Sequence, residues 1–262
     1  MKKRKASSDL PPLPANFHSL YATNKRASTV DDPALHGGRK RQVPHTEGNW
    51  PTHVYIEWRP NDSELENLQS LIDAFAKQSK VPITSLLTSD LDAPLPLHIS
   101  LSRSLQVPTE GRDELLSAVT DSITNTAVKS FPAEASRLKW VPNYDKTRWF
   151  LSLALKRPPY DELKLLLVAC NKTAKAKGYP MLYTRPNSSD QDMDSRDYTE
   201  FFHFSLAWSL ASDIDAKSSN AVLDDIWKNS EAQDLDIMVD TVLAKIGNAI
   251  HSIKLGSRAS RS

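Results

Sequence analysis

Two histidines of this chain lie in segments that repeat each other. Residues 97–105 (LHISLSRSL) align with residues 202–210 (FHFSLAWSL), and the aligned segments share one histidine, two serines and two leucines. Side chains alternate between the two faces of a strand, so His98 and Ser100 are expected on one face. His203 and Ser205 repeat that arrangement, and the apolar neighbours of both pairs point to the opposite face. Each segment is therefore predicted to be a strand that displays an imidazole and a hydroxyl.

Paired imidazoles suit acid–base chemistry at a phosphate. An unperturbed histidine titrates near a pKa of about 6.5, so one ring can act as base while the other acts as acid. A serine hydroxyl can donate a hydrogen bond to a phosphate oxygen beside the imidazole. RNA carries an internal nucleophile, the 2′-OH. One histidine would take its proton and the other would protonate the leaving 5′ oxygen. The expected product is a 2′,3′-cyclic phosphate, formed without a metal or any other cofactor.

A single His-x-Ser motif has little specificity, because a strand histidine is more often structural than catalytic. The repeat makes the pair more specific, and the remaining histidines lack the motif: His18, His36, His45, His53 and His251. The chain has no glycine-rich phosphate loop, no Gly-x-Ser-x-Gly elbow and no His-Glu-x-x-His zinc helix. Cys170 is the only cysteine, which excludes an internal disulfide and a cysteine zinc cage.

The charge balance argues against a polycation that coats nucleic acid. Lys and Arg number 33 and Asp and Glu 32, for a net charge of +1. Any affinity for RNA must therefore come from local patches. No run of about 18 apolar residues is present to cross a membrane, so we expect a soluble intracellular protein.

The elements that must position the repeats alternate between strands and helices. Expected strands lie near 53–58, 97–102, 136–142, 148–156 and 201–208, with a final hairpin of 237–246 and 249–255 turned by Gly247 and Asn248. Expected helices lie from about 63 to 75, where Ser63 and Glu66 form a capping box, and near 110–127, 159–177 and 215–229. Residues 180–200 are expected to form a polar loop, with Asp190, Asp192 and Asp194 solvated. This order predicts an α+β protein of two similar lobes.

The chain ends differ in composition from the rest. Residues 1–47 are rich in Pro, Ser, Asn and basic residues and have no sustained hydrophobic period, so we expect a disordered basic tail. Basic clusters at 2–5 and 39–41 are typical of nuclear-import signals or RNA-contacting arms, although a solvated tail would also explain them. We expect one two-lobed domain over 48–256 and a disordered tail at 257–262.

These motifs resemble those of the two-histidine phosphoesterase superfamily, in which paired His-x-Ser/Thr motifs come from two pseudo-symmetric lobes. The closer resemblance is to the U6 small nuclear RNA (snRNA) phosphodiesterase family, whose members are 3′–5′ exoribonucleases that trim the oligouridine tail of U6. The similar segments together span about 48–255: 48–55, 98–105, 143–150, 202–208 and 239–255. The resemblance implies two antiparallel sheets with helices outside and a cleft between the lobes.

The resemblance also implies roles for particular residues. His98 and His203 would be the catalytic pair, with His203 as base toward the 2′-OH and His98 as acid toward the leaving oxygen. Ser100 and Ser205 would bind the phosphate, and Tyr198 would stack on the terminal uracil. A nuclear, monomeric enzyme acting on RNA would follow, with no membrane partner and no metal.

Two alternatives remain open from the sequence. The same chemistry could serve another substrate, such as 2′,5′-linked RNA or a cyclic phosphate from transfer-RNA splicing. The chain could instead be a non-catalytic RNA-binding protein, although binding alone would not require two matched acid–base groups.

Overall fold

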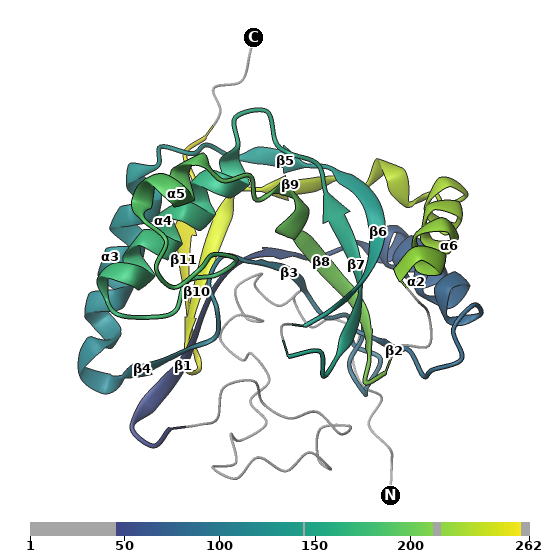
Figure 1. Cartoon of the computed structure of the whole chain (residues 1–262), viewed down its shortest axis with the longest axis horizontal. Coiled ribbons are helices and arrows are strands. Elements are labelled where there is room, and N and C mark those ends of the chain that lie inside the picture. Colours follow the sequence, from purple (N-terminus) through teal and green to yellow (C-terminus); the bar gives the residue numbers. More distant parts are fainter. Residues whose placement is uncertain (1–45, 144, 212–215, 258–262) are drawn as a thin grey trace, which may run out of the picture.

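The fold contains two larger antiparallel sheets with helices on their outer sides, and a third sheet of two strands (Figure 1). The computed structural model describes residues 46–143, 145–211 and 216–257. The basic clusters expected to act as import signals or RNA-contacting arms lie outside these ranges. None of the helices in the described ranges is long and apolar enough to cross a membrane.

The first sheet combines strands from both ends of the chain. Its order is β11 (Ala249–Lys254), β10 (Thr241–Ile246), β1 (Asn49–Trp58) and β3 (Leu97–Ser100), and β4 (Leu105–Pro108) also pairs with β1. Helices α3 (Arg112–Asn125) and α4 (Glu162–Ala176) pack behind it. The opposite face of the sheet, which carries His98, is left open for a site.

The second sheet is built from the middle of the chain. Its order is β2 (Thr84–Ser85), β8 (His203–Ser209), β7 (Trp149–Leu155) and β6 (Ala135–Pro142), with α2 (Asp62–Ala76) and α6 (Ala216–Lys228) beside it. The rings of Phe75 in α2 and Trp140 in β6 lie 4.9 Å apart. The expectation of an α+β fold with two lobes is confirmed, but the lobes interleave along the chain and are not its two halves.

The strand alternation predicted for the repeats is present. Leu97 and Ile99 are buried in the core, whereas His98 is exposed and Ser100 is half-buried. In β8, Phe204 and Leu206 are buried and His203 and Ser205 are half-buried. Burial of each apolar side chain stabilises the strand by about 1.5–3 kcal/mol and so fixes which face the polar groups occupy.

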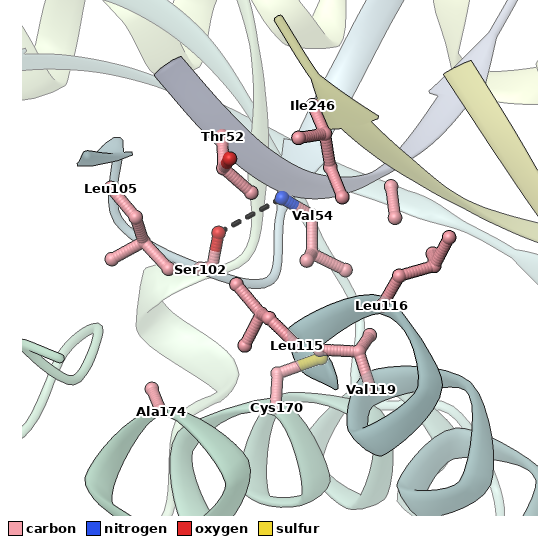
Figure 2. A pocket seen from close by; sticks show the side chains of 11 residues that line it. Thr52, Val54, Ser102, Leu105, Leu115, Leu116, Val119, Cys170, Ala174 and Ile246 are labelled. Carbon is pink, nitrogen blue, oxygen red and sulfur yellow. Dashed lines mark hydrogen bonds between the residues drawn. The ribbon is translucent and has the colours of Figure 1, made fainter. Parts of the chain in front are cut away.

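Behind the first sheet, the core contains a small apolar cavity (Figure 2). Val54 of β1, Leu115 and Val119 of α3 and Cys170 of α4 line it. Burial raises the pKa of the Cys170 thiol to about 12, so this cysteine is a neutral core residue. At its edge, the Ser102 hydroxyl accepts a hydrogen bond of 2.9 Å from the Val54 N–H.

The start of α2 differs from the prediction. The N-cap is Asn61, whose side chain accepts from the Glu64 N–H, and the Glu64 side chain accepts from the Asn61 N–H. The capping box predicted at Ser63 and Glu66 is therefore wrong by two residues. Asn is as good a cap as Ser, and the sequence offers both with a Glu three residues later.

Three further boundaries differ. Helix α4 begins at Glu162, after Asp161 in a left-handed conformation, and it ends before Gly178 as predicted. Within 180–200 a short helix, α5 (Asp190–Ser195), replaces part of the expected loop: Ser189 caps it, and Asp190 and Asp194 form ion pairs with Lys175 and Lys172. The strand predicted over 237–246 is split at Asp240. Its first part, β9 (Ile237–Val239), pairs with β5 (Phe131–Ala133) and not with β11.

Candidate active site

The open face of the first sheet carries a cluster of aromatic and polar side chains. His98 and Ser100 of β3 lie opposite Glu57 and Tyr55 of β1 in the strand register. The His98 ring lies 5.5 Å from the ring of His53 and 5.8 Å from that of Tyr55, in edge-on contacts. The His53 and Tyr55 rings stack at 5.2 Å. These contacts hold the His98 ring on the face that the sequence predicts.

The second histidine is held by a backbone hydrogen bond. His203 Nδ1 lies 2.7 Å from the carbonyl oxygen of Phe201, the last residue of the short helix Thr199–Phe201. A carbonyl can only accept, so Nδ1 carries the proton, and in the neutral ring Nε2 is free to accept one. Burial lowers the pKa of His203, and the charge of Lys139 adds to this, while the bond to Phe201 opposes it. The geometry suits a neutral general base.

The two histidines come from strands of different sheets that contact each other, β3 and β8. Surrounding protein atoms lower the pKa of His98 through burial, although part of the ring contacts solvent. The charge of His203 lowers that pKa further. The fold thus brings together residues that are far apart in the sequence.

The two serines differ in their hydrogen bonding. The Ser100 hydroxyl lies 3.2 Å from His53 Nε2. Across the described ranges no hydrogen bond involves the Ser205 hydroxyl, which faces the same side as Lys139 and Ser152 in the strand register. Ser152 is fully buried, and its hydroxyl also lacks a partner among the described atoms. Of these two hydroxyls, the half-buried Ser205 is the one available to a ligand.

A pocket of about 540 Å³ opens beside His203, within the range of small-ligand sites. Its wall includes Tyr183, which stacks on Phe201 with ring centres 4.9 Å apart. Tyr183 has a φ of 57°, an uncommon backbone conformation for a non-glycine residue. The strain and the position both mark Tyr183 as a candidate ligand-binding residue.

Basic residues line the rim of the same pocket. Arg137 and Lys139 of β6 both form ion pairs with Glu200, at 2.6 Å and 2.7 Å. Asp224 also lines the pocket, so its two cations and two carboxylates balance in charge. An anion that binds here must therefore compete with Glu200 for Arg137 and Lys139.

The prediction that Tyr198 stacks on a base does not fit this structure. The Tyr198 side chain is 0% exposed, and Phe201 and Arg196 pack against its ring. Neither ring face is accessible, so Tyr198 is a core residue. Tyr183 is the tyrosine that the fold places in the pocket with His203.

A second residue that the sequence reasoning missed is His53. It lacks the His-x-Ser motif, yet β1 brings it against both Ser100 and His98. The signal that could have found it is the period-two pattern of His53, Tyr55 and Glu57, which puts three polar or aromatic side chains on one strand face. Among the described residues, no group of three His, Cys, Asp or Glu is arranged to hold a metal ion.

Comparison with known proteins gives the site its context. Residues 11–254 match the model of a family described as "HVSL: Uncharacterised conserved protein". U6 snRNA phosphodiesterase 1 of Neurospora crassa is 34% identical to this chain, and the alignment covers 96% of this chain and 76% of the relative. The mouse protein of that name is 26% identical, with 93% and 83% covered.

Two solved structures of Kluyveromyces marxianus Usb1 have the same fold. One has a TM-score of 0.55 at 16% identity, and the one with uridine monophosphate has a TM-score of 0.56 at 17% identity. Each comparison covers 78% of this chain and 98% of the other. Fold and paired histidines together define a two-histidine phosphoesterase. Within that class, the chain belongs to the U6 snRNA phosphodiesterase family.

Proposed function

We propose that this chain is an RNA phosphodiesterase that shortens the 3′ end of U6 snRNA, as a 3′–5′ exoribonuclease acting on terminal uridines. The single observation that carries the proposal is the pair His98 and His203, which lie on contacting strands, β3 and β8, of the two sheets. The names of the family members supply the substrate.

In the proposed mechanism, His203 is the general base. Its Nδ1–H is held by the Phe201 carbonyl, so the lone pair of Nε2 takes the proton of the 2′-OH. The 2′ oxygen attacks the adjacent phosphorus, and the bond from phosphorus to the 5′ oxygen of the last nucleotide breaks. That oxygen receives its proton from His98, and the shortened RNA keeps a 2′,3′-cyclic phosphate.

His98 must carry a proton to act as acid, although its pKa is lowered in the free protein. A bound phosphodiester brings a negative charge next to the ring, and an opposite charge favours the protonated form. Ser100 and Ser205 bind the non-bridging oxygens as hydrogen-bond donors. The terminal uracil stacks on Tyr183, whose ring already stacks on Phe201 at the pocket wall.

The test is an RNA ending in several uridines, incubated with the protein in excess EDTA beside His98→Ala and His203→Ala. Stepwise shortening from the 3′ end by the wild type alone is the expected result. Phosphatase treatment of the products, with and without prior acid opening, distinguishes a cyclic phosphate from a 3′-phosphate. If the protein opens small cyclic phosphates but does not cleave this RNA, the chemistry is supported and the proposed substrate is wrong. If the protein binds the RNA but cleaves nothing, it is a non-catalytic RNA-binding protein.

Three other expectations belong to this proposal. The EDTA arm tests independence from metal, and sedimentation of the purified protein tests the expected monomer. Nuclear residence rests on the basic clusters at 2–5 and 39–41 and on the substrate. Imaging of the tagged chain, with both clusters changed to alanine as the comparison, tests that location.

A further inference from the structure

A third histidine lies directly beside one of the two proposed phosphate-binding serines. His53 Nε2 is 3.2 Å from the Ser100 hydroxyl, and the His53 ring packs against the rings of both Tyr55 and His98. Ser205, the equivalent serine of the second motif, has no hydrogen-bond partner within the described segments. The two halves of the site are therefore unequal, and His53 accounts for the difference.

Backbone hydrogen bonds between the residues next to His53 and Ser100 fix this geometry. Val54 accepts hydrogen bonds from the Leu101 and Ser102 N–H groups at 2.9 Å and 3.1 Å. The Val54 N–H in turn donates to the Ser102 hydroxyl (Figure 2). The chain on either side of the His53–Ser100 contact is thus tied together, and the distance between these side chains is set by the fold.

His53 is uncharged at any pH at which the enzyme would work. Its pKa is lowered to about 3, first by burial and then by the charges of His98 and Lys245, while the Ser102 backbone has a smaller opposing effect. A group with this pKa is neither a general acid nor a cation for phosphate near neutral pH. His53 can therefore act on Ser100 only through a hydrogen bond between two neutral groups.

Phosphate chemistry indicates the direction of that bond. A non-bridging phosphate oxygen can only accept hydrogen bonds, and Ser100 has a single O–H to give. If Ser100 gives its O–H to the phosphate, its oxygen can receive a hydrogen bond from elsewhere. The Nε2–H tautomer of neutral His53 supplies that donor at the observed position. Such a donor both holds the serine rotamer and polarises its O–H toward the substrate.

We propose that His53 is a positioning residue that acts through Ser100, holding the serine hydroxyl as a donor to the scissile phosphate. The inference rests on the proposed phosphodiesterase function and adds a residue to that site. His53 does not touch the reacting atoms itself. Its effect on cleavage therefore requires the Ser100 hydroxyl.

Two substitutions separate the hydrogen bond from the packing. His53→Phe keeps a ring in contact with Tyr55 and His98 but has no ring nitrogen. His53→Gln loses the ring but can place an amide N–H near the position of Nε2. We expect kcat on an oligouridine RNA to fall roughly 10- to 100-fold in His53→Phe, the range for losing a hydrogen bond to a buried polar group. His53→Gln should recover most of that loss.

A double variant tests the route through Ser100. Ser100→Ala alone should slow cleavage, and adding His53→Phe to it should cost no more than about a further twofold, because coupled residues are not additive. Full activity of His53→Phe would overturn the proposal. So would equal losses in the Phe and Gln variants, or a full additional loss in the double variant. Thermal melting of each variant verifies folding. A wild type that cleaves no RNA would instead refute the proposed function.

Discussion

At the scale of single residues, the environment gives the two histidines of the site different starting states. His203 has a fixed tautomer through the Phe201 carbonyl, whereas no such bond to His98 is present among the described residues. Both have a lowered pKa, and in both the first cause is burial. The base is thus already neutral in the free protein, whereas the acid becomes protonated when the charge of the bound phosphate raises its pKa.

This difference predicts the pH dependence of cleavage. The term kcat/KM reports the free enzyme, in which His98 must be protonated and its pKa lies below 6.5. Above that pKa, log(kcat/KM) should fall with a slope of about −1 per pH unit. The falling limb of kcat should lie at higher pH, because the bound phosphate raises the pKa of His98. Initial rates measured from pH 4.5 to 9 locate the falling limb of kcat/KM and that of kcat. A kcat/KM that stays flat up to pH 8 would contradict the assignment of His98 as acid.

The placement of Tyr183 predicts which tyrosine matters for the base. Tyr183→Ala should weaken cleavage of a uridine-ended RNA about 5- to 100-fold, the equivalent of about 1–3 kcal/mol of stacking per base. Tyr183→Phe should stay within about twofold, because stacking needs the ring and not the hydroxyl. Tyr198→Phe is the matched control and should leave cleavage unchanged. A loss in Tyr198→Phe that matches Tyr183→Ala would return the role to Tyr198.

At the scale of elements, a few side-chain bonds hold the catalytic strands in register. The Ser102 hydroxyl is the partner of the buried Val54 N–H. Ser102→Ala should therefore lower the free energy of unfolding by about 1–3 kcal/mol, the cost of an unsatisfied buried donor. Ser104→Ala, at an exposed position two residues further on, should change it by less than about 0.5 kcal/mol. Urea denaturation of both variants measures the difference, and equal stabilities would show that water replaces the serine.

The strand β6 and the short helix before β8 together set the charge of the pocket rim. Glu200 is ionised, since the ion pairs with Lys139 and Arg137 lower its pKa. Glu200→Gln should release both cations, tighten RNA binding and steepen its salt dependence by about 0.7 per added phosphate contact. Asp190→Asn, which breaks an exposed ion pair on α5, is the control. Filter binding from 50 to 300 mM salt tests this, and an unchanged slope would mean that the RNA does not reach Arg137 and Lys139.

The elements also show what the sequence could and could not predict. Both His-x-Ser strands were predictable, because hydrophobic alternation and the repeat indicate the same faces for His98 and His203. The cap of α2 was not, since Asn61–Glu64 and Ser63–Glu66 satisfy the same pattern. Tyr183 and His53 enter the site through contacts between distant segments. The period-two pattern around His53 indicates its strand face, but a pattern of local spacing does not show which distant residues it contacts.

At the scale of the whole molecule, the site exists only when both sheets are folded. β1, β10 and β11 of the first sheet come from the two ends of the chain, and the second sheet comes from the middle. Unfolding of the whole domain would expose His53, His98 and His203 together and return each to its ordinary pKa. Stability and protonation of the site are therefore linked.

The sign of this linkage follows from the lowered pKa values. The unfolded chain binds more protons at these histidines than the folded one, so their contribution to stability is complete above about pH 6.5. It is lost as the pH falls below 6.5 toward the pKa of about 3 for His53. His53 alone contributes a slope of about 1.4 kcal/mol per pH unit in this window.

His53→Phe removes that titration and should flatten the dependence of the unfolding free energy on pH. Urea denaturation of wild type and variant at pH 7.5, 5.5 and 4.5 measures it. The difference between the two proteins cancels the carboxylates that titrate in both. Tyr55→Phe, which alters the same ring cluster but keeps His53, should remain parallel to the wild type. Parallel curves for His53→Phe and wild type would mean that His53 becomes protonated in the folded protein as easily as in the unfolded chain. In that case His53 would be a cation in acid, and its hydrogen bond to Ser100 would be charged.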